Sequence, residues 1–169
     1  DPKDFDFCLG GEGVDAALQR FNSCGLLRHG PFGSPRWFPP SDTGRYCDLI
    51  PIRRFQNGLW QCEDIIDALN QFDFTGNAIA YDLRTGGFFN PQNGRRDLLR
   101  RVMRAVRFDY PNEPIAPGVT ISRPAVVWFR ILHYAAKLGL AIEPVTMRWL
   151  VANRHHLDRL EQFSEVFFR

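Results

Sequence analysis

The sequence contains no apolar run long enough to cross a membrane, and its charged first residues do not resemble a signal peptide. No two of its four cysteines form a Cys-x-x-Cys pair, and their spacing with the four histidines matches no zinc site. We therefore expect a soluble protein with no membrane partner and with reduced, mostly packed thiols. Such thiols predict an intracellular location, in the cytoplasm or in an organelle.

A strong net charge is also lacking, because the formal charge of the 169 residues is only +2. Overall composition therefore gives no argument for nucleic-acid binding, which has to depend on where the charges lie. Residues 94–107 hold six arginines and one aspartate, whereas residues 63–73 are acidic. Hydrophobic residues make up 44% of the chain, with 15 Phe and 4 Trp, so we expect one folded globular unit with a real core.

Hydrophobic periodicity and turn residues predict a mixed α/β part followed by a helical part. Strands are expected at 4–9 and 46–55, a loop or edge structure at 26–46, and a hairpin at 76–91. Helices are expected at 14–24, 62–72, 95–107, 125–140, 145–163 and 164–169. The helix at 95–107 is expected to be amphipathic, with an apolar face and a basic face. Residues 111–118 are the best linker, so the predicted units are 1–110 and 111–169.

The opening strand carries two carboxylates one residue apart. Asp4 and Asp6 would share one face of a strand, with Phe5 and Phe7 buried on the other. Two aligned carboxylates make half of a divalent-metal clamp, and Asp48 near the start of a later strand is a plausible third. The alternative is that the pair is the solvated face of an edge strand and Asp48 is a turn residue.

Five segments occur in an order that matches a known family. They are "PKDFDF", "CDLIPIRRF", "DFTGNAIAYD", "FFNPQNGRRDLLRRVMRAV" and "RILHYAAKLGLAIEPVTMRWLVANRHHLDRL". In this order the chain resembles the bacterial-type poly(A) polymerase and CCA-adding tRNA nucleotidyltransferase family over nearly its whole length. The resemblance implies an α+β head of the polymerase-β-like nucleotidyltransferase type with a mixed sheet, then an all-helical neck. It also implies that the chain is the head-plus-neck portion of a longer protein.

The resemblance assigns roles to particular residues. It makes Asp4, Asp6 and Asp48 the catalytic carboxylates, with Asp4 and Asp6 as ligands of Mg²⁺. The implied nucleotide-binding residues are Asp73, Asn77 and Arg130. Arginines of the basic helix that would track RNA phosphates are Arg96, Arg100 and Arg104, although a solvated helix face explains them equally well.

The chain departs from the family at its nucleotide-binding positions. The two arginines that precede the family's "DFT" are here Gln71 and Phe72, which removes two cations from a site for a triphosphate. In the helix that reads the incoming base, an acidic residue is replaced by Arg123 and only Arg130 of the arginines remains.

Two functions follow from this mixture. The first is enzymatic, a template-independent nucleotidyl transfer to an RNA 3′ end, of tRNA or another RNA, from ATP or CTP with Mg²⁺. The second is a catalytically inactive module that binds RNA or assembles with a protein partner or a second copy. The retained aspartates favour the enzyme, and the lost arginines favour the inactive module.

Overall fold

The computed structural model describes residues 4–30, 34–41, 44–54, 62–116 and 118–168, and for Asp4 and Arg54 it describes the backbone only. The chain divides into two compact units, Asp1–Ile65 and Ile66–Arg169. This division lies elsewhere than residue 110, and the head and neck boundary stays a prediction. Within the described residues no helix is long and apolar enough to cross a membrane. All four cysteines are free.

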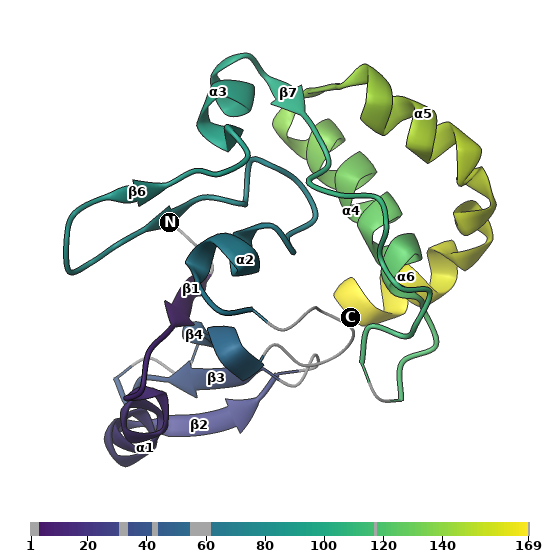
Figure 1. Ribbon diagram of the computed structural model, residues 1–169. Coiled ribbons are helices and arrows are strands. Elements are labelled where there is room, and N and C mark those ends of the chain that lie inside the picture. Colours follow the sequence, from purple (N-terminus) through teal and green to yellow (C-terminus); the bar gives the residue numbers. More distant parts are fainter. Residues whose placement is uncertain (1–3, 31–33, 42–43, 55–61, 117, 169) are drawn as a thin grey trace. The chain divides into compact units, whose positions relative to one another are not determined.

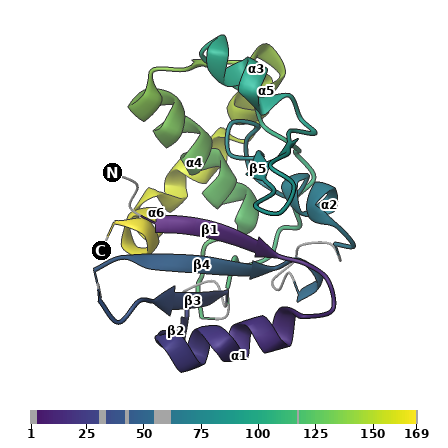
Figure 2. The same ribbon diagram turned by 90° about the vertical axis from the view of Figure 1, so that its left-hand side faces the viewer.

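The first unit is built on a mixed four-stranded sheet in the order β1-β4-β3-β2 (Figures 1 and 2). β1 (Asp4–Leu9) runs parallel to β4 (Tyr46–Pro51), and β3 (Pro35–Phe38) is antiparallel to both β4 and β2 (Leu26–His29). α1 (Val14–Cys24) connects β1 to β2, and a short 3₁₀ helix (Ile52–Arg54) follows β4. The strand predicted at 4–9 and the helix predicted at 14–24 are confirmed, whereas the strand predicted at 46–55 ends at Pro51, just before the 3₁₀ helix.

The segment at 26–46, expected as loop or edge structure, contributes two strands. Its β2 lies at the sheet edge, as expected, but β3 lies between β2 and β4. Pro35 is tolerated because it is the first residue of β3, where no ladder donor is needed from it. Residues 31–33 and 42–43 of this segment lie outside the described residues.

α1 packs against the sheet face that carries Trp37. The Trp37 indole Nε1 donates to the Phe21 carbonyl at 2.8 Å, and the two rings meet edge to face with centroids 5.3 Å apart. A side chain at Gly25 would collide with this contact, since its Cβ would lie 2.4 Å from Trp37 Nε1 and 2.6 Å from the Phe38 carbonyl oxygen. The helix therefore has to end in glycine. Arg36 and Asp48, which alternate with Trp37 and Cys47, lie on the opposite face.

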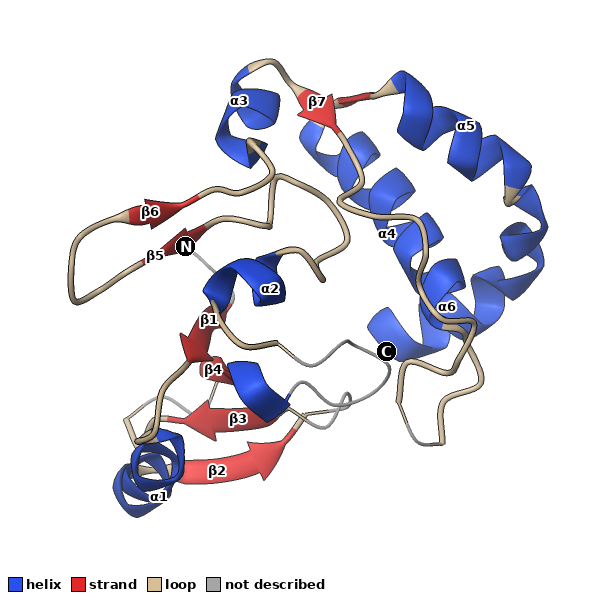
Figure 3. Ribbon diagram, viewed as in Figure 1, coloured by secondary structure: helices blue, strands red, loops and turns tan. Residues whose placement is uncertain are grey.

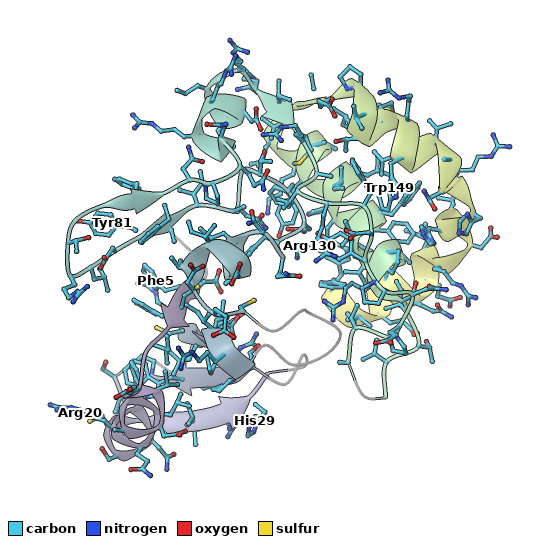
Figure 4. All side chains as sticks on the ribbon, viewed as in Figure 1. Phe5, Arg20, His29, Tyr81, Arg130 and Trp149 are labelled. Carbon is cyan, nitrogen blue, oxygen red and sulfur yellow. The ribbon has the colours of Figure 1, made fainter. Side chains whose placement is uncertain are left out.

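Phe5 is not buried as predicted. Its side chain is 49% exposed (labelled in Figure 4), whereas Phe7 is half-buried. Phe5 and Asp6 are both exposed and Phe7 and Cys8 are both half-buried, so burial does not alternate along β1. Because β1 is an edge strand, only one lateral neighbour covers Phe5.

The second unit begins with short elements. α2 (Ile65–Leu69) is followed by a hairpin of β5 (Ala80–Tyr81) and β6 (Phe88–Phe89), as predicted (Figure 3). Gly86 takes the left-handed conformation at the hairpin turn, with φ +74°. α3 (Gly94–Leu99) then leads to β7 (Val102–Met103), which pairs in parallel with β8 (Ala141–Ile142).

The single basic helix expected at 95–107 is wrong. α3 ends at Leu99, and Arg101 takes a left-handed conformation with φ +57°. Beyond it the chain is extended, because Met103 pairs with β8 and Ala105 bridges Phe74 of the "DFT" segment. Leu99, expected on the apolar face, is 78% exposed. Tertiary pairing has overridden the helical pattern.

From Arg123 onward the second unit is mostly helical (blue in Figure 3). α4 (Arg123–Leu138) ends at Gly139, which is left-handed with φ +61°, as its sequence predicts. The helix expected over 145–163 is instead α5 (Pro144–Ala152), a 3₁₀ segment (Arg154–Arg159) and α6 (Leu160–Phe167). The break at Asn153 lets α6 turn back onto α4, where Phe163 stacks on Phe129 with ring centroids 4.7 Å apart.

Candidate functional site

One row of charged residues crosses the sheet of the first unit. Asp6 of β1 is the register partner of Asp48 in β4, Asp48 is the partner of Arg36 in β3, and Arg36 is the partner of Arg28 in β2. Residues that are directly opposite in neighbouring strands share a face of the sheet. The row therefore reads acid, acid, base, base on the face opposite α1. The structure brings the predicted Asp6 and Asp48 together on adjacent strands.

Asp48 is held by a two-pronged ion pair. Arg36 Nε donates to Asp48 Oδ1 at 2.8 Å, and Arg36 Nη2 donates to Oδ2 at 3.2 Å. The two side chains are 22% and 20% exposed. The guanidinium also lies over the Tyr46 ring, with Cζ 3.9 Å from the ring centroid. A planar guanidinium bound on one edge and stacked on one face has a fixed orientation, so Asp48 is fixed as well.

Cys8, two residues beyond Asp6, has an unreactive thiol. Burial and then the charge of Asp6, with a contribution from Cys62, raise the pKa of Cys8 to about 11. The thiol is therefore protonated at neutral pH and is neither a nucleophile nor a metal ligand in that form. The described groups on this face of the sheet that could bind a metal ion are therefore the carboxylates of Asp6 and Asp48.

The donor set here has the chemistry of a magnesium site. Asp6 and Asp48 supply carboxylate oxygens, and Mg²⁺ commonly uses one or two protein carboxylates together with substrate phosphates. No group of three His, Cys, Asp or Glu that could hold a metal occurs among the described side chains. The side chain of Asp4, the other predicted ligand, lies outside them. A cation at Asp48 would have to share that carboxylate with Arg36.

A second polar cluster lies in the second unit, and it joins the three predicted nucleotide-binding residues. Asp73 is 8% exposed. Its Oδ2 accepts a hydrogen bond from Arg130 Nε at 2.6 Å, and its Oδ1 accepts from Asn77 Nδ2 at 2.6 Å. The amide oxygen Oδ1 of Asn77 is buried and has no hydrogen-bond partner in the described structure. Both Asp73 oxygens are thus used inside the protein, and Asn77 Oδ1 is the acceptor that remains.

Two residues missed by sequence reasoning lie beside the lost arginine positions. Arg107 Nη1 donates to Gln71 Oε1 at 2.5 Å, and the Tyr110 hydroxyl donates to the Phe72 carbonyl at 2.6 Å. Burial, with the nearby charge of Asp73, raises the pKa of Tyr110 far above its usual range. Arg107 is the last residue of the helix expected at 95–107, and helical spacing gives no signal of a contact with Gln71. Folding has put a cation next to Gln71.

The three predicted RNA-contacting arginines have different settings. Arg96 and Arg100 are exposed, within α3 and at its C-terminal end. Arg104 is bound internally, since its Nε donates to Asp97 Oδ2 at 2.9 Å and its Nη2 donates to the Gln92 carbonyl. Asp97 also accepts from the hydroxyl of Thr75, next to the Asp73 cluster. Arg96 and Arg100 remain available to a phosphate, whereas Arg104 supports the protein.

The sequence is similar to curated proteins of one name. A segment of 74 residues is 45% identical to the Multifunctional CCA protein of Xanthomonas oryzae pv. oryzae, covering 44% of this chain and 16% of that protein. A segment of 90 residues is 40% identical to the Multifunctional CCA protein of Xanthomonas axonopodis pv. citri, covering 52% of this chain and 20% of that protein. No family model matches the sequence.

Solved structures are similar in fold to nearly the whole chain. A Thermotoga maritima CCA-adding enzyme complexed with tRNA has a TM-score of 0.70 at 20% identity, covering 98% of this chain and 37% of that one. A tRNA nucleotidyltransferase complexed with a primer tRNA and an incoming ATP analog has a TM-score of 0.68 at 21% identity, with coverages of 96% and 44%. The resemblance to CCA-adding enzymes is confirmed. The predicted α+β fold, with a mixed sheet and a helical C-terminal part, is that of these enzymes.

The comparisons also set the extent of the similarity. The chain spans less than half the length of these two solved structures, and its matched segments span a fifth or less of the two Xanthomonas proteins. The activity, the substrates and the partners of the whole protein are therefore matters for proposal.

Proposed function

We propose that this chain belongs to an enzyme that adds nucleotides to an RNA 3′ end without a template, from ATP or CTP. The observation that supports it most is the adjacency of Asp6 and Asp48 on parallel strands of a CCA-adding fold. The curated relatives have names of the same activity class. A tRNA substrate and four free thiols both favour an intracellular location.

The proposed reaction is an in-line displacement at phosphorus. The oxygen of the RNA 3′ hydroxyl bonds to the α-phosphorus of the nucleotide, the bond to pyrophosphate breaks, and the hydroxyl loses its proton. Asp6 and Asp48, with Asp4, would hold Mg²⁺ at the reacting phosphate. When bound, the cation lowers the pKa of the attacking hydroxyl and offsets the charge on the leaving pyrophosphate.

The second cluster would position the nucleotide. Arg130, held by Asp73, would bring a guanidinium with a fixed orientation. The unpaired amide oxygen of Asn77 is buried, so a rotation of this side chain would have to uncover it before it could accept from a sugar hydroxyl or a base amine. Arg107, beside Gln71, supplies part of the positive charge that the family's missing arginines would bring. Arg96 and Arg100 would contact the RNA backbone.

The alternative function is a catalytically inactive module that binds RNA or assembles with a protein partner or a second copy. Two observations favour it. Asp48, the third predicted catalytic carboxylate, accepts hydrogen bonds from Arg36 on both of its oxygens. The acidic residue of the base-reading helix is replaced by Arg123, whose buried Nε has no partner in the described structure.

One assay separates the two functions. The full-length protein is incubated with a short labelled RNA, Mg²⁺ and CTP or ATP, beside the variants Asp6→Asn and Asp48→Asn. Asp158→Asn, an exposed carboxylate in the second unit, is the matched control. Extension by the wild type and the control that falls at least a hundredfold in both site variants supports the enzyme, because each variant removes a charged ligand. No extension by the wild type overturns the enzyme and leaves the inactive module, whereas equal extension by the wild type and Asp6→Asn overturns the assignment of Asp6 as a catalytic carboxylate.

A further inference from the structure

Arg36 occupies the side of Asp48 that a metal ion would otherwise neutralise. A carboxylate has about four lone-pair positions on its two oxygens, and Arg36 takes one on each oxygen. The fork also places a full positive charge beside the acidic pair. In the described structure Asp48 therefore already has a cation, and that cation belongs to the protein.

Arg36 makes a second contact that would remain if its ion pair with Asp48 were broken. Its guanidinium lies 3.9 Å from the centroid of the Tyr46 ring, and Tyr46 belongs to the same strand as Asp48. This cation–π contact does not depend on the carboxylate. In the next strand Arg28 is directly opposite Arg36, and like charges in opposed positions repel. The ion pair with Asp48 and the stacking on Tyr46 are thus separate contacts of Arg36, and only the ion pair would have to break for a cation to take its place at the carboxylate.

We propose that Arg36 is an exchangeable counter-cation of Asp48, which competes with a divalent cation for this carboxylate and, once displaced, binds the phosphates of the nucleotide. The proposal depends on the proposed function for its nucleotide step. The proposal gives a role to Arg36, which the sequence did not predict as a site residue but which lies in the same cross-strand row as Asp6 and Asp48.

The size of the competition follows from simple electrostatics. A unit charge about 4 Å from a carboxylate in a half-exposed setting changes the affinity of that carboxylate for a second cation by roughly tenfold. Removing the Arg36 charge should therefore strengthen divalent-cation binding by about that factor. Removing the Arg28 charge, one strand further away and exposed to solvent, should change it by less than about twofold.

The test measures Mn²⁺ binding to the full-length protein, from the electron paramagnetic resonance signal of free Mn²⁺. Arg36→Gln should bind Mn²⁺ about tenfold more tightly than the wild type, and Arg28→Gln, the matched control, should bind like the wild type. Adding Asp48→Asn to Arg36→Gln should remove the gain. Mn²⁺ binding by Arg36→Gln that is equal to or weaker than that of the wild type overturns the proposal.

A second arm tests the nucleotide step at saturating Mn²⁺, with a non-hydrolysable ATP analogue followed by calorimetry. Arg36→Gln should bind the analogue several-fold more weakly, and Arg36→Lys should lie between Gln and Arg, because lysine keeps the charge but not the fork. Arg36→Met, which removes the charge and keeps a long side chain, replaces Arg36→Gln in the Mn²⁺ measurement if the glutamine variant does not fold. Unchanged affinity for the analogue in both variants overturns the nucleotide step.

The outcome is distinguishable from failure of the proposed function, since Mn²⁺ binding needs neither RNA nor transfer. If the wild type transfers no nucleotide but Arg36→Gln binds Mn²⁺ more tightly than the wild type, the competition at Asp48 is supported and the proposed enzymatic function is overturned. If the wild type extends RNA but Arg36→Gln binds Mn²⁺ with unchanged affinity, the enzymatic function is supported and the competition at Asp48 is overturned.

Discussion

At the scale of single residues, the buried contact of Asp73 with Arg130 links two parts of the second unit. Arg130 lies on α4 (Figure 4), whereas Asp73 belongs to the "DFT" segment 57 residues earlier. The Nε–Oδ2 distance is 2.6 Å, and the two side chains are 28% and 9% exposed. The sequence named both residues as nucleotide-binding. The structure adds that they bind each other, which makes them supports of the fold as well.

Asp73→Asn should therefore destabilise the protein. The substitution keeps the shape and an acceptor for Asn77 but leaves Arg130 facing a neutral group. Breaking a buried pair costs about 3–5 kcal/mol, and the partial exposure of Arg130 reduces our expectation to about 2–3 kcal/mol. Urea denaturation measures this as a lower midpoint at constant slope.

The matched control is Asp109→Asn, which also removes a carboxylate that is bonded to an arginine, here Arg107 at 2.8 Å. Asp109 is 72% exposed, so the loss should stay below about 1 kcal/mol. Equal losses in the two variants would contradict the assignment of Asp73 as a buried partner.

At the scale of elements, the arginines of residues 95–107 have two different settings, because some lie on α3 and others lie in the extended segment after it. Arg96 and Arg100 project from an exposed helix end, and Arg104 lies in the extended segment that bridges the "DFT" segment. If the exposed pair contacts RNA phosphates, only these two should affect the salt dependence of binding.

The double variant Arg96→Gln/Arg100→Gln should weaken binding of a short single-stranded RNA. Each lost phosphate contact removes about 0.7 from the slope of log affinity against log salt, so the magnitude should fall by about 1.4. Fluorescence anisotropy over a salt series gives this slope. Arg148→Gln, an exposed arginine on α5, should leave it unchanged. An unchanged slope in the double variant would assign this pair to a solvated helix face.

The start of α5 depends on Glu143. Its carboxylate accepts from the Thr146 backbone N–H at 2.8 Å and from the Thr146 hydroxyl at 3.1 Å. Burial opposes ionisation, but hydrogen bonds from the Thr146 and Val145 amides and from the Thr146 hydroxyl outweigh it and lower the pKa of Glu143 below 4.5. Thr146 is fully buried and its hydroxyl also accepts from the Ala105 amide. The cap therefore connects α5 to the strand beside the "DFT" segment.

Glu143→Ala should lower the free energy of unfolding by about 1 kcal/mol at neutral pH, the usual cost of a lost cap. A carboxyl group whose pKa is lowered by folding stabilises above its unfolded pKa, and this stabilisation is lost as the pH falls through the folded pKa. The difference between wild type and variant should thus narrow below pH 4.5. Urea titrations at neutral pH and at acid pH measure it, with Glu143→Gln, which keeps an acceptor, as the control. A difference that grows on acidification would contradict the cap.

At the scale of the whole molecule, each of the two compact units contains fully buried apolar side chains. Leu49 in β4 is fully buried in the first unit, and Ile131 in α4 is fully buried in the second. If the units open independently, a cavity at one position should loosen mainly the unit that contains it.

Leu49→Ala and Ile131→Ala should each cost about 2–5 kcal/mol in the unit that contains them. Hydrogen exchange followed by mass spectrometry should show faster exchange mainly in the 4–54 peptides for Leu49→Ala, and mainly in the 66–168 peptides for Ile131→Ala. Equal acceleration in both sets by either variant would show that the units unfold as one.

Local patterns predicted the elements whose residues satisfy one another within the segment. Alternation in "DFDFCL" gave β1, and helical spacing that ends at a glycine gave both α1 and α4. The same patterns failed at 95–107, because helical spacing of apolar residues does not show that a distant segment will pair with Met103 and Ala105. They failed again at Asn153, where contact of α6 with α4 decides the break.

The sequence by itself determined the family resemblance, the mixed sheet with a helical part after it, and the carboxylates to consider, because these depend on residue type and spacing along the chain. Only the tertiary structure decided what those side chains face. It placed Asp6 beside Asp48 and paired Asp48 with Arg36. It also paired Asp73 with Arg130, since strand register and helix packing set the neighbours of a charge. The charge that surrounds a carboxylate governs its affinity for a cation, and that charge comes from residues 12 and 57 positions away.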